Sequence, residues 1–388
     1  MPIRNRLAEM HNEITGWRRH LHANPELQFD VHETAAFVAE KLRAFGVDEV
    51  TEGIGRTGVV AVIKGREAGG RTIGLRADMD ALPITEATGL DYASQNDGKM
   101  HACGHDGHTA MLLGAAQYLA ETRNFAGTAV LIFQPAEEGG GGGREMVNDG
   151  LMDRWQIDEV YGMHNMPGLP TGQFAIRPGP LLAAADMFTI RVIGKGGHAA
   201  APHQAVDPNV AAAHVIVALQ SIASRVTDPL AAVVVTIGSL HSDSVVGNVI
   251  PHVVTMEGTV RALDEGVRAE AQARVLAITE ATGQAHGCTA EIDYEVGYPV
   301  TINADANTGH AVAAARAVTD HVLTDCPPIM AAEDFSFMLN ERPGAYIMIG
   351  NGDTAMVHHP EYNFDDDAIP AGCSWFAEIV EQRLPLGK

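Results

Sequence analysis

The segment "GTAVLIFQPAEE" (residues 127–138) decides the fold class. Its apolar residues follow one another almost without interruption, so the pattern is not the alternation of a half-exposed strand. A continuous apolar strand is typical of a largely parallel sheet that is covered on both faces. The segment therefore predicts an inner strand of an α/β domain, and it ends on two adjacent carboxylates, Glu137 and Glu138.

Strand and helix patterns alternate on both sides of this segment. The expected strands are 57–65, 71–78 and 158–167, and the expected helices are about 2–22, 32–46 and 109–122. This alternation predicts a covered, mostly parallel sheet.

The pattern changes near residue 186. The order becomes strand, helix, two strands, helix, strand, over 187–194, 207–224, 231–240, 252–263, 265–284 and 289–298. That β-α-β-β-α-β order is the split unit of a ferredoxin-like domain. We therefore expect an α/β domain with a mostly parallel sheet, formed by residues 1–185 and 299–388, and an inserted α+β ferredoxin-like domain at 186–298.

Charge and composition exclude several classes of partner. The 388 residues carry 26 basic and 49 acidic side chains, a formal net charge of -23, which disfavours nucleic acid and anionic membranes. No segment approaches the ~18 apolar residues of a membrane span, and the N-terminus has no apolar signal core. The four scattered cysteines predict free thiols in a reducing compartment, so we expect a cytoplasmic protein without membrane partners.

The segment "HACGHDGHTA" (101–110) is the first candidate metal site. Cys103 and His105 can reach one ion only if they lie in a loop, with a helix starting near His105 or Asp106. The helix N-terminus would then favour a thiolate, the form of cysteine that binds metals. The alternative is a helix cap flanked by buried histidines.

The pair Glu137 and Glu138 is the second candidate. Two adjacent carboxylates at a strand end are costly unless a cation meets them. One can hold a metal while the other activates a metal-bound water as general base. The alternative is a solvated loop. Glycines 139–143 lack the Gly-Lys-Ser/Thr ending of a nucleotide-binding loop, so nucleotide binding is not expected.

Further histidines and aspartates complete the set. His164 follows an apolar strand, and His358 and His359 lie near the C-terminus. In an open parallel sheet, ligands collect at the carboxyl ends of the strands. Sulfur, nitrogen and oxygen donors together suit two divalent ions of the zinc or manganese kind. Asp78 and Asp80 follow another strand; Asp80 could orient a ligand histidine, and either could be a turn residue.

The chain resembles the M20 metallopeptidases, in the amidohydrolase branch of hippurate hydrolases, N-acyl-amino-acid amidohydrolases and auxin-conjugate hydrolases. The motifs cover nearly the whole length and include "RRHLHANPEL" (18–27), "RADMDALPI", "MHACGHDGHTAMLLGAA", "FQPAEEGGGG", "GKGGHAAAPH" and "HHPEYNFDD".

This resemblance implies two divalent metal ions, manganese or zinc, with nickel or cobalt as alternatives. The implied ligands are Cys103, His105, Glu138, His164 and His358, with Cys103 in a bridging position and Glu137 as the catalytic base. The family ligand precedes a variable residue and then proline. Here the variable residue is His359, so an exchange of His358 and His359 stays open. The superfamily's His-x-Asp motif is Asp78-Met79-Asp80 here, so Asp78 receives no ligand role.

The inserted domain resembles the family's lid and dimerisation domain, which implies a homodimer or higher homo-oligomer. His198 resembles the lid histidine that stabilises the oxyanion, often in the partner subunit's site. Asn248 and Arg261 resemble binders of the substrate carboxylate; a turn residue and a surface charge are the alternatives.

The expected function is metal-dependent hydrolysis of the amide bond of N-acyl amino acids, of the aminoacylase or hippurate hydrolase type. A metal-bound hydroxide attacks the carbonyl, with Glu137 as general base. The alternatives are a metal-dependent dipeptidase or carboxypeptidase using the same site and, more remotely, a metal-binding protein without catalysis. The sequence names neither the acyl group nor the amino acid.

Overall fold

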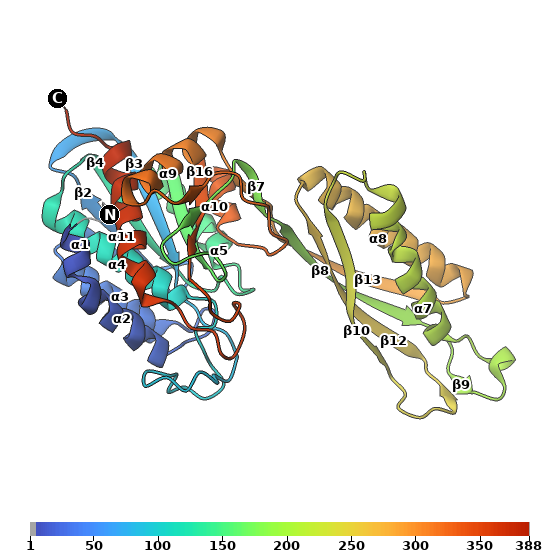
Figure 1. Cartoon of the computed structure of the whole chain (residues 1–388). Helices are drawn as coiled ribbons and strands as arrows, with labels where there is room; N and C mark the ends of the chain where they lie inside the picture. Colours follow the sequence, from blue (N-terminus) through green and yellow to red (C-terminus); the bar gives the residue numbers. More distant parts are fainter. Residues whose placement is uncertain (1–4, 388) are drawn as a thin grey trace. The chain divides into compact units, whose positions relative to one another are not determined.

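The polypeptide divides into two units in the computed structural model, which describes residues 5–387 (Figure 1). Unit 1 holds the described residues up to Leu181, together with Ile302–Pro327 and the residues from Asp334 onward. Unit 2 holds Leu182–Thr301 and Pro328–Glu333. The second unit is thus inserted into the first, and unit 1 is made of segments from both ends of the chain.

Unit 1 contains most of the helices. They are α1 (Asn5–Glu9), α2 (His11–Ala23), α3 (His32–Ala44), α4 (His105–Thr122), α5 (Gly142–Asn148), α6 (Leu151–Arg154), α9 (Asp305–Val318), α10 (Ser336–Glu341) and α11 (Ile369–Arg383). Its large sheet contains β1 (Glu49–Ile54), β2 (Gly58–Lys64), β3 (Glu67–Asp78), β4 (Ala126–Gln134), β5 (Glu159–Met166), β6 (Phe174–Ala175), β15 (Val322–Leu323) and β16 (Gly344–Gly350). Strands β7 (Gly179–Leu182) and β14 (Thr301–Asn303) pair where the chain passes between the units.

The order of the large sheet is β1-β2-β4-β3-β5-β16-β6-β15. The central strands β4, β3, β5 and β16 run parallel, and antiparallel pairs occur at β1-β2, β2-β4 and β16-β6. The expected α/β domain with a mostly parallel sheet is therefore confirmed. Because β4, β3 and β5 are parallel neighbours, their carboxyl ends meet at one edge of the sheet.

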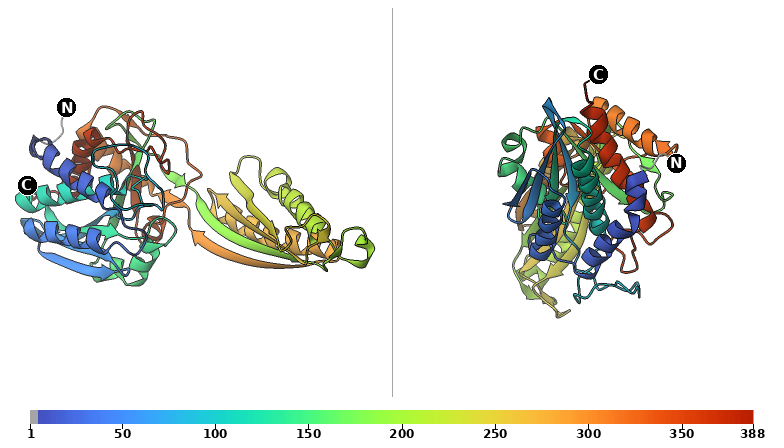
Figure 2. Two further views of the ribbon diagram at one scale, coloured as in Figure 1. Left: turned by 90° about the horizontal axis from the view of Figure 1, so that it is seen from below. Right: turned by 90° about the vertical axis from the view of Figure 1, so that its left-hand side faces the viewer.

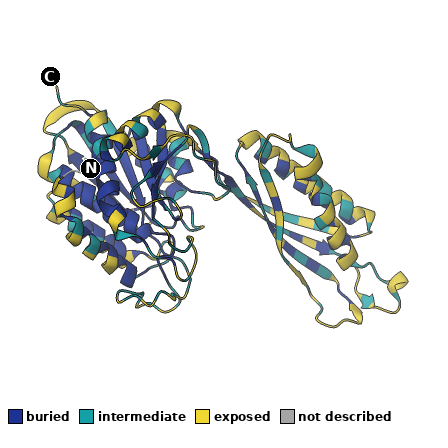
Figure 3. Cartoon of the chain, in the orientation of Figure 1, coloured by how far each residue is buried: buried dark blue, intermediate teal, exposed yellow. Residues whose placement is uncertain are grey.

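Helices cover both faces of this sheet (Figures 2 and 3). On β4, Ala129, Leu131 and Phe133 share one core with α2, α3, α4, α9 and α11. The intervening residues Val130 and Ile132 are equally buried on the other face, where α5 packs against β4. Burial on both sides explains why this strand has a continuous apolar sequence.

Several boundaries differ from the sequence expectation; β3 and α4, for example, begin at Glu67 and His105 and not at residues 71 and 109. The strand predicted to reach residue 138 ends at Gln134, because Pro135 has no N–H for the ladder and Ala136 adopts a φ of +53°. Glu137 and Glu138 therefore lie in a turn. The helix expected over about 2–22 is two helices, since the chain breaks at Met10; residues 2–4 of that expectation lie outside the described residues.

Unit 2 contains β8 (Ala184–Ile193), α7 (Pro208–Leu219), β10 (Val233–Ser242), β12 (Val253–Ala262), α8 (Glu265–Ala285) and β13 (Thr289–Tyr298), with the short strands β9 (Gly197–His198) and β11 (Val249–Ile250). Its sheet is antiparallel in the order β10-β12-β8-β13. This is the β-α-β-β-α-β arrangement of a ferredoxin-like domain. Alternate residues of β8, such as Phe188, Ile190 and Val192, share a core with α7 and α8.

One helical segment of unit 2, Pro208–Val226, is long and apolar enough by composition to cross a membrane, although 28% of it is buried in the domain. The sequence analysis expected no segment of this kind, and in that respect the expectation was wrong. Ala211, Ala212, Val215 and Leu219 of this segment pack into the core of unit 2. A domain helix with one buried face accounts for its apolar composition.

Glu159, at the start of β5, joins three elements of unit 1. Its carboxylate accepts hydrogen bonds from Arg383 on α11 at 2.7 and 3.0 Å and from the Tyr161 hydroxyl at 2.7 Å, and it also pairs with Arg71 on β3. Burial works against the charge, but these partners lower the pKa of Glu159 to about 2.

We predict that Glu159→Gln lowers the free energy of unfolding by roughly 2–3 kcal/mol at neutral pH. Because the folded pKa is depressed, this contribution is present above about pH 4.5 and is lost as the pH falls through about 2. Urea unfolding of both proteins at several pH values measures it. A difference in stability that stays constant down to pH 2 would contradict the assignment.

Candidate metal centre

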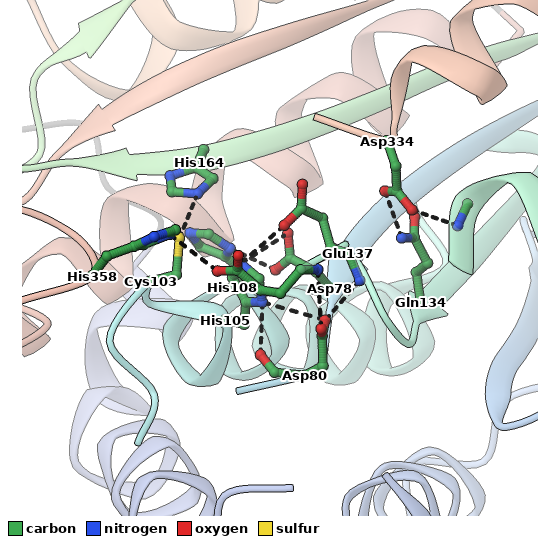
Figure 4. A network of polar contacts seen from close by, with 12 residues as sticks. Asp78, Asp80, Cys103, His105, His108, Gln134, Glu137, His164, Asp334 and His358 are labelled. Carbon is green, nitrogen blue, oxygen red and sulfur yellow. Dashed lines mark hydrogen bonds and ion pairs between the residues drawn. The ribbon is translucent and has the colours of Figure 1, made fainter. Parts of the chain in front are cut away.

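Three parallel strands bring the candidate residues to one edge of the unit 1 sheet (Figure 4). Asp78 ends β3, the Glu137-Glu138 turn follows β4, and His164 lies near the end of β5. Cys103 lies in the loop that precedes α4, and His105 is the first residue of α4. This start meets the condition under which the sequence analysis allowed both side chains to reach one ion. The structure thus gathers all five predicted metal ligands and Glu137 in overlapping groups of side chains.

His105 has one ring nitrogen fixed by hydrogen bonding. Its Nδ1–H donates to the backbone carbonyl of Asp80 at 2.7 Å. Nε2 is buried and has no hydrogen-bond partner among the described residues. Burial opposes a charge on this ring, yet the charges of Asp78 and Cys103 raise the pKa of His105, so a metal ion at Nε2 would take the place of a proton. The nearest carboxylate oxygens, from Asp78 and Glu137, lie 3.8 and 4.0 Å away. An oriented imidazole of this kind is prepared for a metal.

His164 is oriented in the same way. Its Nδ1–H donates to the backbone carbonyl of Asn165 at 2.6 Å, so its Nε2 carries the lone pair and lies 3.3 Å from Sγ of Cys103. Burial lowers the pKa of His164 to about 3, which keeps the imidazole neutral. Burial also raises the pKa of the Cys103 thiol, so a thiolate at this position needs a cation beside it.

The buried carboxylate of Asp80 fixes the backbone of both glutamates. Asp80 accepts hydrogen bonds from the backbone N–H of Glu137 at 2.9 Å and from that of Glu138 at 3.1 Å. The sequence left two roles open for Asp80, orienting a ligand histidine or forming a turn. The contact with His105 uses mainly the Asp80 carbonyl, since its carboxylate lies 3.6 Å from the ring. Asp80 therefore links the Cys103/His105 loop to the glutamate turn.

The structure separates His358 from His359. Nε2 of His358 lies 3.2 Å from Oε1 of Glu138, and its ring joins Cys103 and Glu138 in one group. Hydrogen bonds to Cys103 and Glu138 raise the pKa of His358 to about 10. His359 instead accepts a hydrogen bond from the backbone N–H of Glu361 through Nδ1. This geometry favours His358 as the ligand.

The residues of this site fit a pair of divalent ions. The imidazoles of His105 and His164 are both oriented by a backbone carbonyl, burial raises the pKa of the Cys103 thiol, and the carboxylate of Glu138 lies beside His358. Thiol, imidazole and carboxylate donors together match zinc or manganese. The convergence of four carboxylates at one strand edge, from Asp78, Asp80, Glu137 and Glu138, also calls for positive charge.

Sequence reasoning missed a buried network behind the ligands. Nδ1–H of His108 donates to Asp78 at 2.7 Å, and Arg76 donates to the other oxygen of Asp78 at 2.7 Å. Asp78 is therefore neutralised by residues of unit 1 and lies beside His105 as a support. The alternating Arg76 and Asp78 on a buried strand were the available signal, because buried charges are found in pairs.

The predicted residues of unit 2 fall in two places. His198 and Asn248 line one surface hollow, where β9 pairs with β11. Nδ1 of His198 accepts a hydrogen bond from the backbone N–H of Ala200 at 3.0 Å, so the proton of the neutral ring is on Nε2. Arg261 lies at the opposite end of β12, paired with Ala185 of β8. The structure therefore does not bring Arg261 to His198 within unit 2.

Arg261 is a half-buried cation. Within residues 5–387 its guanidinium makes no hydrogen bond or ion pair, and burial lowers its pKa although the more distant charge of Asp186 acts in the opposite direction. By contrast, Arg191 on the neighbouring strand β8 is paired with Glu291 at 2.6 Å. A guanidinium held this way is available to an incoming anion.

The chain matches the peptidase family M20/M25/M40 over residues 74–382. It is 42% identical over 382 residues to the hippurate hydrolase of Campylobacter jejuni, covering 97% of this chain and 98% of that protein. It is 39% identical over 380 residues to thermostable carboxypeptidase 2 of Saccharolobus solfataricus, covering 95% of each.

A solved Bacillus subtilis structure, described as a dinuclear metal-binding peptidase from the M20 family, is also similar. The sequences are 34% identical, the TM-score is 0.84, and the match covers 97% of this chain and 99% of that one.

We predict that His358→Ala removes most of the stabilisation that Mn²⁺ or Zn²⁺ gives to the metal-free protein, whereas His359→Ala retains it. At a metal concentration about 100 times the Kd, the wild type should gain roughly 5–10 °C in Tm. Thermal melting with and without metal measures the gain. The ligand assignment is wrong if His359→Ala loses the stabilisation and His358→Ala keeps it.

Proposed function

The chain belongs to peptidase family M20/M25/M40, and we propose that it is an enzyme that hydrolyses the amide bond of N-acyl amino acids with two divalent metal ions. This membership confirms the resemblance drawn from its motifs. The observation that carries the proposal is the orientation of His105 and His164, whose Nδ1–H groups are held by backbone carbonyls so that Nε2 lies among Cys103, Glu138 and Glu137.

The proposed ligands are Cys103, His105, Glu138, His164 and His358. When bound, the ions would polarise the scissile carbonyl and lower the pKa of the attacking water. Manganese and zinc are proposed first, with nickel and cobalt as alternatives, because this donor set suits them all. The four cysteines are all unpaired thiols, which fits a reducing cytoplasm.

Glu137 is the proposed general base. Its carboxylate lies within 4.0 Å of Nε2 of His105, and its backbone is fixed by Asp80. From this position it accepts a proton from the attacking water and passes it to the leaving amine. Glu138 faces Cys103 and His358 instead, so the turn after β4 gives the two neighbours different roles.

His198, Asn248 and Arg261 complete the proposed substrate contacts. The Nε2–H of His198 is available to donate to the oxyanion of the tetrahedral intermediate. Arg261 supplies a fork of donors for the α-carboxylate, and Asn248 adds an amide. Because His198 and Arg261 lie at opposite ends of unit 2, we propose that they serve different sites in a homodimer, with unit 2 as the lid and dimerisation domain.

A carboxypeptidase or dipeptidase acting through the same residues is the second candidate. It is favoured by the identity of 39% to the Saccharolobus solfataricus carboxypeptidase. A metal-binding protein without catalysis is disfavoured, since such a site has no need of Glu137 beside its ligands. Hydrolysis rates for N-acetyl and N-benzoyl amino acids against dipeptides, with metal analysis of the purified protein, decide among the three.

We predict that Glu137→Gln retains both metal ions and loses roughly 10²–10⁴-fold in kcat, because the amide cannot accept a proton. Metal analysis and steady-state kinetics measure the two quantities. Glu145→Gln is the control, since Glu145 follows the same glycine-rich loop but pairs with Arg56. Full activity of Glu137→Gln would overturn the base assignment.

We predict that Arg261→Met raises KM and lowers kcat/KM by about 10–100-fold with little change in kcat, because a charged hydrogen bond to bound substrate is lost. Arg191→Met, on the neighbouring strand, should leave both parameters unchanged. An equal fall in kcat and kcat/KM would mean that Arg261 acts on the reacting atoms instead.

A further inference from the structure

A buried ionic cluster on α2 has no role in the proposed chemistry. We define the α2 cluster as Arg18, His22, Glu86, Asp106 and Asp366. Arg18 and His22 on α2 are fully buried, and Asp106 in the first turn of α4 is 1% exposed. Arg18 and His22 belong to the motif "RRHLHANPEL", and Asp106 belongs to "HACGHDGHTA". A motif with no proposed function therefore contacts the motif that carries Cys103 and His105.

The contacts of the cluster are short and charged. The Nδ1–H of His22 donates to Asp106 at 2.8 Å, and its Nε2–H donates to Glu86 at 3.3 Å. Arg18 donates through Nη1 to the same oxygen of Asp106 at 3.5 Å and through Nε to Asp366 at 2.7 Å. Burial opposes the charge on His22, yet Asp106 and Glu86 raise its pKa to about 9.

The cluster connects segments that bear different proposed ligands. Asp106 directly follows His105, and Asp366 lies eight residues after His358. Arg18 contacts both aspartates, and it also donates through Nη2 to the hydroxyl of Tyr92, which donates to Asn363 at 3.1 Å. Arg18 is therefore the side chain of α2 that joins the start of α4 to the segment following His358.

Docking of α2 does not require these charges. Ile14, Trp17 and Leu21 of α2 are buried, and Ile14 and Trp17 belong to the core of unit 1. The start of α4 has no side-chain cap, because its N-cap is Gly104, which has a φ of +94°. On one side it is held by His105, which donates to the carbonyl of Asp80, and on the other the carboxylate of Asp106 is bonded to α2. The contacts with α2 therefore share in setting the position of this start.

We propose that Arg18 and His22 are positioning residues. They hold the Cys103/His105 loop and the segment after His358 at the relative positions that metal binding requires. The inference rests on the proposed function for the identity of the ligands. It assigns the α2 cluster an effect on metal affinity, which is separate from its contribution to stability. Residues that support metal ligands from behind typically change metal affinity by about 10–100-fold when they are removed.

The direction in which metal affinity changes when Arg18 is replaced distinguishes a positioning role from a purely electrostatic one. Removing a cation near a dication site should tighten metal binding by Coulomb's law. Loss of positioning should weaken it. The chain offers a matched pair, because Arg18 and Arg19 both contact Asp366, whereas only the buried Arg18 reaches Asp106.

The experiment titrates metal-free Arg18→Met, Arg19→Met and wild-type protein with Mn²⁺ by calorimetry, at a temperature where circular dichroism shows each to be folded. We expect Arg18→Met to bind Mn²⁺ about 10–100-fold more weakly, and Arg19→Met to bind as the wild type does or more tightly. If Arg18→Met does not fold, His22→Gln replaces it. This variant loses the charged contact of His22 with Asp106 as well as that with Glu86, and it should weaken Mn²⁺ binding in the same direction.

Two results would overturn the proposal. One is a folded Arg18→Met, or His22→Gln in its place, with wild-type or tighter affinity for Mn²⁺, even if its Tm is lower. The other is an equal weakening in Arg19→Met. Because the titration contains no substrate, a protein that failed to hydrolyse N-acyl amino acids would still give a decisive answer about the α2 cluster.

Discussion

The hydrogen bonds of Asp80 are the constraint on which the site depends. Its carboxylate holds the backbone of Glu137 and Glu138, and its carbonyl fixes the ring of His105. These groups come from the ends of adjacent parallel strands and from the loop before α4. One buried residue therefore sets the distance between the proposed base and the proposed ligands, before any metal is bound.

Charge explains why this arrangement needs cations. Carboxylates, a thiol and imidazoles converge in a buried region, and burying them unpaired would be costly. The protein neutralises the rear of the site with its own cations, Arg76 at Asp78 and His22 with Arg18 at Asp106. The front, formed by Cys103, Glu138 and His358, is left for ions from solution.

Much of this could be predicted from the sequence, because apolar periodicity and motif spacing report local structure. The continuous apolar run of β4 and the β-α-β-β-α-β order of unit 2 were both recognisable. The positive φ of Ala136 was not, so the sequence could not distinguish the turn that contains Glu137 and Glu138 from the end of a strand. Buried charge was also hidden: Arg18 and His22 resemble the solvated face of a helix until their distant partners, Asp106 and Asp366, are known.

The central claim is that ligands from four separate segments hold two ions beside Glu137. Anomalous diffraction from crystals grown with Mn²⁺ or Zn²⁺ tests it most directly. The account predicts two peaks about 3.5–4 Å apart, bonded to Cys103, His105, Glu138, His164 and His358. A single ion held by the alternative group of Asp78, His105 and His108, with none at Cys103, would contradict it.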